Sequence, residues 1–173
     1  MIRFLYLNDI LITKRLRQIV KIRSQDQEIM SDLLDHLKNS PAALEVPVAA
    51  ALYDQNLNQV AITHNLRELT SDPCAHAEIV ALRKAGQIFD NWNLEGLSLY
   101  VTLEPCLMCA GAILQSKISR VIFGAFNPET TSQSSVELLR GGNPQLEVVG
   151  GVNEEECSTY LTQWFSEQRK IKR

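Results

Sequence analysis

The sequence contains no apolar run long enough to cross a membrane. Its most apolar N-terminal stretch, residues 4–12, is interrupted by Asn8 and Asp9 and falls far short of the roughly 20 residues that a membrane-spanning helix needs. No secretory signal, internal repeat or low-complexity linker is evident either. These absences argue against a membrane partner, a secreted chain and a repeat array.

Cysteine is scarce, and its pattern does not favour a disulfide framework. The chain has four cysteines, which are Cys74, Cys106, Cys109 and Cys157. Four would suffice for two disulfides, but a Cys-x-x-Cys pair in an intracellular protein is typically a redox pair or half of a metal site. Without a secretory signal, we expect a reducing compartment.

The charge is concentrated at the two ends of the chain. Residues 1–24 carry a net charge of +5 and residues 169–173 carry +4, whereas the whole chain carries −3, so the body between them carries −12. An acidic body argues against broad, non-specific binding to a phosphate backbone. The basic residues at the two ends could still contact a phosphate backbone, so nucleic acid stays possible as a specific partner.

The length and composition predict one compact domain. A chain of 173 residues that is 45% hydrophobic and 21% charged can bury a substantial core. We assign residues 25–173 to this domain and residues 1–24 to a basic N-terminal extension. The extension resembles either an organellar transit peptide, although it has little serine, or a disordered or loosely packed segment.

Hydrophobic periodicity predicts an α/β domain with helices packed on a mixed sheet. Helices are expected over residues 26–39, 76–86, 106–115, 136–140 and 153–170, and strands over residues 46–53, 59–64, 97–103, 120–124 and 146–149. The first two strands are separated by a polar turn at 54–58 and should form a hairpin. Strands and helices alternate from the middle of the chain onward.

Two segments have the residues and spacing of a metal site. Cys106 and Cys109 lie three apart at the start of a predicted helix, so their sulfur atoms share one face, and the helix N-terminus favours thiolate over thiol. His76 also begins a predicted helix after an extended segment, which places it at the same sheet edge. Three protein ligands that leave a fourth position for water are typical of catalytic zinc.

Glu78 distinguishes a catalytic site from a structural one. A carboxylate beside a zinc site can take a proton from water and deliver it to a leaving group. In the alternative, Cys74 completes a closed structural site with one histidine and three cysteines, and Glu78 is a surface charge. Cys74 and His76 are separated by a single residue and make a poor chelate pair, so we favour the open site.

These two segments resemble the signature of a known family. His76-Ala77-Glu78 and Pro105-Cys106-Leu107-Met108-Cys109 are similar to the motifs of the zinc nucleobase deaminases. The resemblance narrows to the tRNA adenosine deaminases and covers about residues 44–170, with matching stretches at 45–48, 75–79, 99–106, 109–113 and 119–125. It implies the three-layer α/β/α fold of the cytidine deaminases, with a central mixed five-stranded sheet.

The resemblance also implies the chemistry of the site. One zinc ion per chain, held by His76, Cys106 and Cys109, would activate a water molecule that attacks C6 of a flipped adenine. Glu78 would protonate the ring nitrogen and help ammonia leave, which gives inosine.

Substrate contacts are implied for four further residues. Asn65 would hydrogen-bond the base, and Ala75 and the backbone around Glu104 would line the pocket. Phe165 belongs to an aromatic pair, Trp164-Phe165, that can stack on a base. A homodimer in the cytoplasm is also implied, with the helix over 106–115 at the interface, or an organellar location if residues 1–24 are a transit peptide.

The sequence departs from the family where RNA would be held. Ala49, His64 and Leu66 stand where the family usually has Gly, Trp and Arg, and residues 127–135 lack a lysine and two glycines of the usual pattern. We therefore expect deamination of the wobble adenosine in a tRNA anticodon loop, with deamination of a free nucleobase or nucleoside of the guanine or cytosine type as the alternative. A non-catalytic zinc subunit is a third hypothesis, which the presence of Glu78 disfavours.

Overall fold

The computed structural model describes residues 22–39, 45–127 and 135–171, and these form one five-stranded sheet covered by helices on both faces. The strands are β1 (Ala49–Tyr53), β2 (Gln59–His64), β3 (Ser98–Leu103), β4 (Arg120–Ala125) and β5 (Glu147–Gly150). Their spatial order is β2-β1-β3-β4-β5. β1 is antiparallel to both of its neighbours, whereas β3, β4 and β5 are parallel, so the predicted mixed sheet is confirmed.

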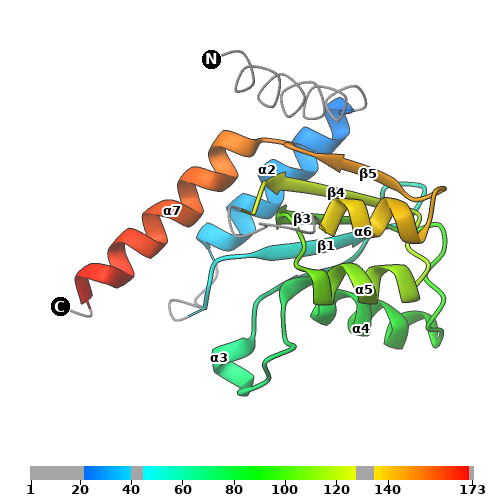
Figure 1. The fold of residues 1–173 in the computed structure, drawn as a ribbon, viewed down its shortest axis with the longest axis horizontal. Coiled ribbons are helices and arrows are strands. Elements are labelled where there is room, and N and C mark those ends of the chain that lie inside the picture. The colour runs from blue at the N-terminus through cyan, green and yellow to red at the C-terminus, as the bar shows by residue number, and fades with distance from the viewer. Residues whose placement is uncertain (1–21, 40–44, 128–134, 172–173) are drawn as a thin grey trace, which may run out of the picture.

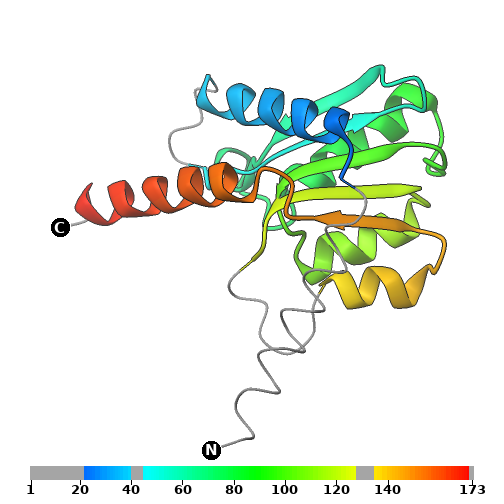
Figure 2. The ribbon, with the colours of Figure 1, turned by 90° about the horizontal axis from the view of Figure 1, so that it is seen from above.

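The helices form two outer layers (Figures 1 and 2). α2 (Ser24–Lys38) and α7 (Glu154–Ile171) cover one face, and α4 (Ala77–Phe89), α5 (Leu107–Gln115) and α6 (Ser135–Gly142) cover the other. Alternate residues of each strand enter the two cores: Tyr100 and Ile122 face α2, and Val101 and Phe123 face α4 and α5. The three-layer α/β/α prediction is therefore confirmed.

The largest differences from the sequence-based expectation are one helix that was not predicted and the bounds of α4 and β1. A short helix, α3 (Arg67–Thr70), was not predicted, because four residues are too few to show a helical period. α4 continues past Gly86 and ends at Phe89, where Asp90 adopts a left-handed conformation and its N–H donates to the Gly86 carbonyl. β1 begins at Ala49, three residues later than expected.

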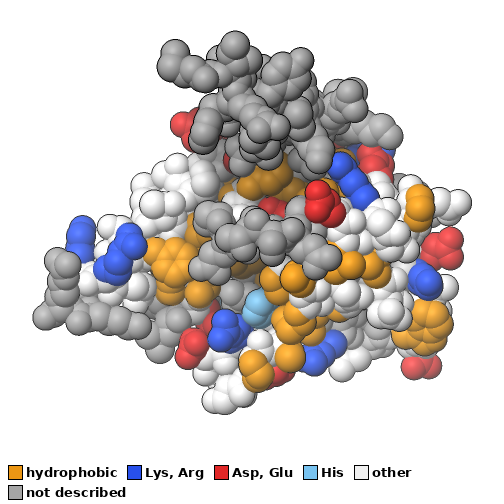
Figure 3. Space-filling view, viewed as in Figure 1, with side chains coloured by type: hydrophobic (Ala, Val, Ile, Leu, Met, Phe, Trp, Pro, Cys, Tyr) orange, Lys and Arg blue, Asp and Glu red, His pale blue; other side chains and the backbone are white. Residues whose placement is uncertain are grey.

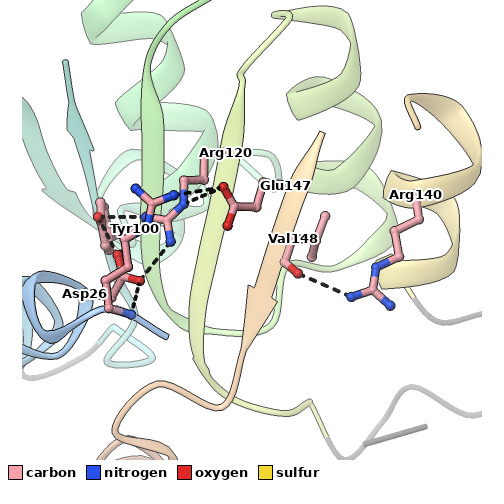
Figure 4. Close-up of polar contacts among 7 residues, drawn as sticks. Asp26, Tyr100, Arg120, Arg140, Glu147 and Val148 are labelled. Carbon is pink, nitrogen blue, oxygen red and sulfur yellow. Dashed lines mark hydrogen bonds and ion pairs between the residues drawn. The ribbon is translucent and has the colours of Figure 1, made fainter. Parts of the chain in front are cut away.

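A buried ion-pair network ties α2 to the strands (Figure 4). Arg120, the first residue of β4, donates to both carboxylate oxygens of Asp26 at 2.7 and 2.8 Å, and the Tyr100 hydroxyl donates to Asp26 at 2.9 Å. Glu147 of β5 pairs with Arg120 Nε at 3.1 Å. Burial would raise the pKa of Asp26, but the hydrogen bonds from Arg120, Arg23 and Tyr100 outweigh it and hold the pKa below its usual range.

A close approach fixes α7 against the sheet. Gly124 has no side chain, and a Cβ atom there would overlap Cys157 Sγ of α7 and crowd the Thr102 carbonyl. Cys157 is buried, and this burial raises the pKa of its thiol to about 12. The thiol therefore packs as a small apolar group between α7 and β4.

The predicted N-terminal extension falls almost entirely outside the described residues. Within them, α2 begins at Ser24, and the backbone N–H of Arg23 donates to the Asp26 carboxylate at 3.0 Å. The boundary between residues 24 and 25 stays a prediction. Among the helices that the structure describes, none is long and apolar enough to cross a membrane.

Candidate metal centre and active site

The two signature segments meet at one edge of the sheet. His76 is the residue immediately before α4, and Cys106 is the residue immediately before α5; both have extended backbone conformations. Cys106 follows the carboxyl end of β3, and His76 follows β2, which runs in the same direction because β1 is antiparallel to both. The predicted convergence of the two segments is therefore confirmed.

The three predicted ligands form a compact cluster. His76 Nδ1 lies 3.7 Å from Cys106 Sγ and 3.5 Å from Cys109 Sγ, and all three ligand atoms lie within 4.8 Å of one another. Tetrahedral zinc with ordinary bond lengths would separate nitrogen and sulfur ligands by about 3.6 Å. The cluster therefore has the dimensions and the donor set of a zinc site, with His76 Nδ1 as the ligating nitrogen.

The helix N-terminus prepares a thiolate at this cluster. A hydrogen bond from the Cys109 thiol, supported by the backbone N–H groups of Cys109 and Met108 and opposed by burial, lowers the pKa of Cys106 to about 5. The same contact, together with burial and the Glu78 carboxylate, raises the pKa of Cys109. Cys106 is thus the first anionic ligand, and a metal cation would displace the proton that Cys109 holds.

Glu78 lies beside the cluster in the first turn of α4. Its side chain is 4% exposed and comes within hydrogen-bonding reach of Cys109. Burial raises the pKa of its carboxyl above the usual value. The geometry suits the predicted proton-transfer role, which stays a prediction.

Asn65 and Ala75 are buried residues at the two ends of the connection between β2 and α4. The Asn65 amide donates to the Val46 carbonyl, and its oxygen accepts from the Ala77 N–H, both at 2.9 Å. The Ala75 carbonyl accepts from the Leu66 N–H at 2.9 Å. An asparagine side chain can make about four hydrogen bonds. Asn65 makes these two with its own chain, so it can make further hydrogen bonds to a base. The predicted base contacts of Asn65 and Ala75 stay predictions.

Glu104 is buried and makes specific contacts with its side chain. One carboxylate oxygen accepts from the Asn127 N–H at 3.1 Å, and the other accepts from the Ser135 hydroxyl at 2.9 Å. Glu104 therefore joins the turn that leads to Cys106 to the end of β4 and the start of α6. Sequence reasoning proposed a backbone contact at Glu104 and missed these side-chain bonds, which link residues far apart in the sequence.

The remaining predicted residue, Phe165, lies on α7 away from the cores. Its side chain is 42% exposed, and its ring packs edge-on against Trp164 with a centroid distance of 5.0 Å. The C-terminal part of α7 projects beyond the sheet in both ribbon views. Of residues 127–135, where the sequence departs from the family pattern, the structure describes Asn127 and Ser135, the first residue of α6.

Of the three histidines, His76 alone joins the metal cluster. His64, which stands where the related family usually has tryptophan, is half-buried and faces His36 of α2, with ring centroids 6.2 Å apart. Side chains alternate between the two faces of a strand, and the preceding residue, Thr63, bonds to α4. The His64 side chain therefore lies on the other face of β2, away from α4.

Comparison with known proteins agrees with this site. Residues 23–125 match the family model described as the cytidine and deoxycytidylate deaminase zinc-binding region. The chain belongs to this family. The deaminase is 42% identical over 153 residues to a protein of Bacillus subtilis strain 168 named tRNA-specific adenosine deaminase, covering 87% of this chain and 94% of the relative.

Solved structures give the same assignment of fold. The deaminase matches a structure from work on A-to-I editing by tRNA:A34 deaminases with a TM-score of 0.65 and 32% identity, covering 75% of this chain and 96% of the other. A guanine deaminase from Nitrosomonas europaea matches with a TM-score of 0.71 but only 21% identity, over 85% and 86% of the two chains, and shares the fold.

The metal of this family fits the cluster seen here. The deaminase offers one imidazole nitrogen and two sulfur atoms at tetrahedral spacing, a donor set that selects zinc. The site therefore holds one zinc ion per chain, as predicted. Cys74 is exposed and is absent from the cluster of ligand atoms formed by the described residues, which agrees with the open site and not with the closed alternative.

Proposed function

We propose that this deaminase converts adenosine to inosine at the wobble position of a tRNA anticodon loop. The observation that carries the proposal is a zinc-type cluster with a buried carboxylate beside it. It occurs in a chain that is 42% identical, over 87% of its length, to a protein named tRNA-specific adenosine deaminase. The reaction consumes one water molecule and releases one ammonia molecule: a C–O bond forms at C6 of adenine and the C–N bond to the amino group breaks.

The residues of the site divide this reaction between them. When zinc is bound, it supplies Lewis-acid activation of water at neutral pH. Glu78 would accept the first proton of water and deliver it to the ring nitrogen. It would then take the proton of the new hydroxyl group at C6 and deliver it to the amino group, which leaves as ammonia. Glu78 is 4% exposed, so its carboxylate is largely shielded from bulk solvent.

The surface around the site offers contacts for RNA. Arg67 on α3 and Arg169 and Lys170 near the end of α7 are exposed cations. Figure 3 shows Lys and Arg side chains at the projecting end of α7 and below the centre of this face, with hydrophobic side chains between them. Phosphate contacts from the cations would position the strand, and the Trp164-Phe165 pair could stack on an unpaired base.

A matched pair of substrates tests the proposal. An anticodon stem-loop with adenosine at the wobble position should release ammonia and gain inosine, whereas the same stem-loop with adenosine moved to the neighbouring loop position should react much more slowly. Free adenine, adenosine, guanine and cytosine serve as the small-molecule comparison. Ammonia release from the small molecules alone would reject the tRNA proposal and favour the alternative.

We also propose that the deaminase is a homodimer that acts in a compartment containing tRNA, either the cytoplasm or an organelle. Support comes from a hollow of about 660 Å³ between α4 and α5, with Leu82, Leu94 and Trp92 in its lining. Trp92 is 69% exposed, and Ile88 and Phe89 nearby on the chain are 55% and 49% exposed. Exposed apolar groups in this number favour burial against a second protein surface.

Sedimentation equilibrium checks the dimer. We expect a species of twice the 19.5 kDa chain mass, because two copies would bury their exposed apolar residues against each other. Trp92→Glu should shift the equilibrium to monomer, whereas Leu69→Glu, at a residue that is 77% exposed on α3, should leave the dimer intact. A monomeric wild-type chain at all concentrations would contradict the proposal.

A further inference from the structure

The end of β2 holds the turn that carries the catalytic residues. Three hydrogen bonds join the two segments: Leu66 N–H to the Ala75 carbonyl at 2.9 Å, Ala77 N–H to Asn65 Oδ1 at 2.9 Å, and the Thr63 hydroxyl to the Ala77 carbonyl at 2.8 Å. Ala77 is fully buried between His76 and Glu78 in the sequence. Both of its peptide groups are therefore held by side chains, the N–H by Asn65 directly after β2 and the carbonyl by Thr63 within β2.

Thr63 donates the hydrogen bond to the Ala77 carbonyl, which is the side of Ala77 that leads to Glu78. Its hydroxyl is 2.8 Å from the Ala77 carbonyl and 3.2 Å from the Ala50 carbonyl, and its side chain is buried. A hydroxyl has one proton to donate, and the shorter distance assigns it to Ala77. The carbonyl of Ala77 belongs to the peptide group that joins Ala77 to Glu78, so this contact constrains the orientation of that peptide group.

We propose that Thr63 is a positioning residue for the deamination. Within the described residues its hydroxyl bonds to the carbonyls of Ala77 and Ala50, and not to a metal ligand or to the Glu78 carboxylate. Thr63 therefore acts through the Ala77 peptide group. By holding this peptide group, Thr63 fixes where the Glu78 carboxylate lies relative to the metal cluster. The inference deepens the proposed function and rests on it for the catalytic readout.

The effect should fall on turnover and not on substrate binding. Proton transfer depends steeply on the distance and direction between the carboxylate and the reacting atoms, and a small displacement can cost a large factor in rate. RNA binding depends on contacts over a wider surface, which the Ala77 peptide group does not supply. A loosened Thr63 contact should therefore lower kcat while KM changes little.

Three variants test the proposal. Thr63→Val replaces the hydroxyl with a methyl group of similar size, and Thr63→Ser keeps the hydroxyl and removes the methyl group. Ser119→Ala is the control, because it removes one internal hydrogen bond at the opposite end of the sheet, which the Ser119 hydroxyl accepts from the Gly96 N–H at 2.7 Å. For each variant, kcat, KM, zinc content and amide hydrogen exchange at residues 77–80 are measured on the full-length chain.

We expect Thr63→Val to lower kcat about tenfold, with KM within about twofold, zinc content unchanged and faster amide exchange at residues 77–80. Thr63→Ser and Ser119→Ala should keep the wild-type kcat. An unchanged kcat in folded Thr63→Val, or an equal loss in Thr63→Ser, would overturn the proposal. If Thr63→Val does not fold, Thr63→Ala replaces it.

The two proposals fail in different ways. If wild-type protein does not deaminate the stem-loop, the proposed function fails, and amide exchange still decides whether Thr63 holds the start of α4. If wild-type protein is active but Thr63→Val matches it in both kcat and amide exchange, only the role of Thr63 fails.

Discussion

Replacing Glu78 with alanine should lower kcat by about 10³-fold while the chain keeps one zinc ion. The estimate follows from the usual contribution of a positioned general acid and base, about 10²- to 10⁴-fold. Zinc is retained because its ligands are His76, Cys106 and Cys109, and Glu78 lies beside the cluster without belonging to it. Stem-loop deamination and metal content, measured on the same preparation, check this result.

Glu78→Gln refines the test of proton transfer. Glutamine keeps the volume of the buried side chain but cannot accept a proton, so it should lose activity nearly as much as alanine does. The control is Glu95→Ala, which removes an exposed glutamate in the connection before β3. Wild-type turnover in either Glu78 variant would show that another group moves the proton.

Replacing Arg120 with methionine should lower the free energy of unfolding by about 3 to 5 kcal/mol, the usual cost of removing one partner of a buried ion pair. The Asp26 side chain is 1% exposed, so the variant leaves a carboxylate buried without its main partner. Urea unfolding followed by circular dichroism measures the change. Lys38→Ala, which breaks the exposed pair between Lys38 and Asp35, should cost far less.

The destabilisation by Arg120→Met should depend on pH. In the wild-type protein the pKa of Asp26 is held below 3.8, so its charged form contributes stability above that pH, and this contribution is lost as the pH falls through the folded-state pKa. In the variant, burial is no longer opposed by Arg120, so the pKa rises and the carboxyl is protonated at higher pH. The difference between the proteins should therefore shrink as the pH falls from the raised pKa of Asp26 in the variant to its lowered pKa in the wild type. A difference that does not change with pH would show that packing, and not charge, causes the effect.

The sequence was sufficient to predict the layers and the metal cluster but not the tertiary polar contacts. Strand β4 and helix α5 were found from their apolar patterns, and the zinc ligands from the Cys-x-x-Cys spacing and a single histidine before a helix. The bond between Asp26 and Arg120 joins residues 94 positions apart, and no local period encodes such a pair. The short helix α3 carries no buried residue and so has no apolar stripe.

Within the site, side chains that carry chemistry were easier to predict than those that hold them. Glu78 was identified because its residue type and distance from His76 have a chemical meaning. Thr63 has no such signal, since a threonine in a strand is ordinary and its partner Ala77 lies 14 positions later. Glu104 was noted for its backbone, yet its side chain connects Asn127 and Ser135, a role that depends on how β4 and α6 come together.

The distribution of the four cysteines gives the protein a built-in position for a chemical label. Cys157 is buried behind Gly124 with its thiol protonated, and Cys106 and Cys109 are committed to zinc in the loaded enzyme. Cys74 alone is exposed, and it precedes His76 by two residues. A thiol-reactive fluorophore would therefore attach at Cys74, two residues before the metal ligand His76. Its emission would report the binding of metal or substrate without any engineered substitution.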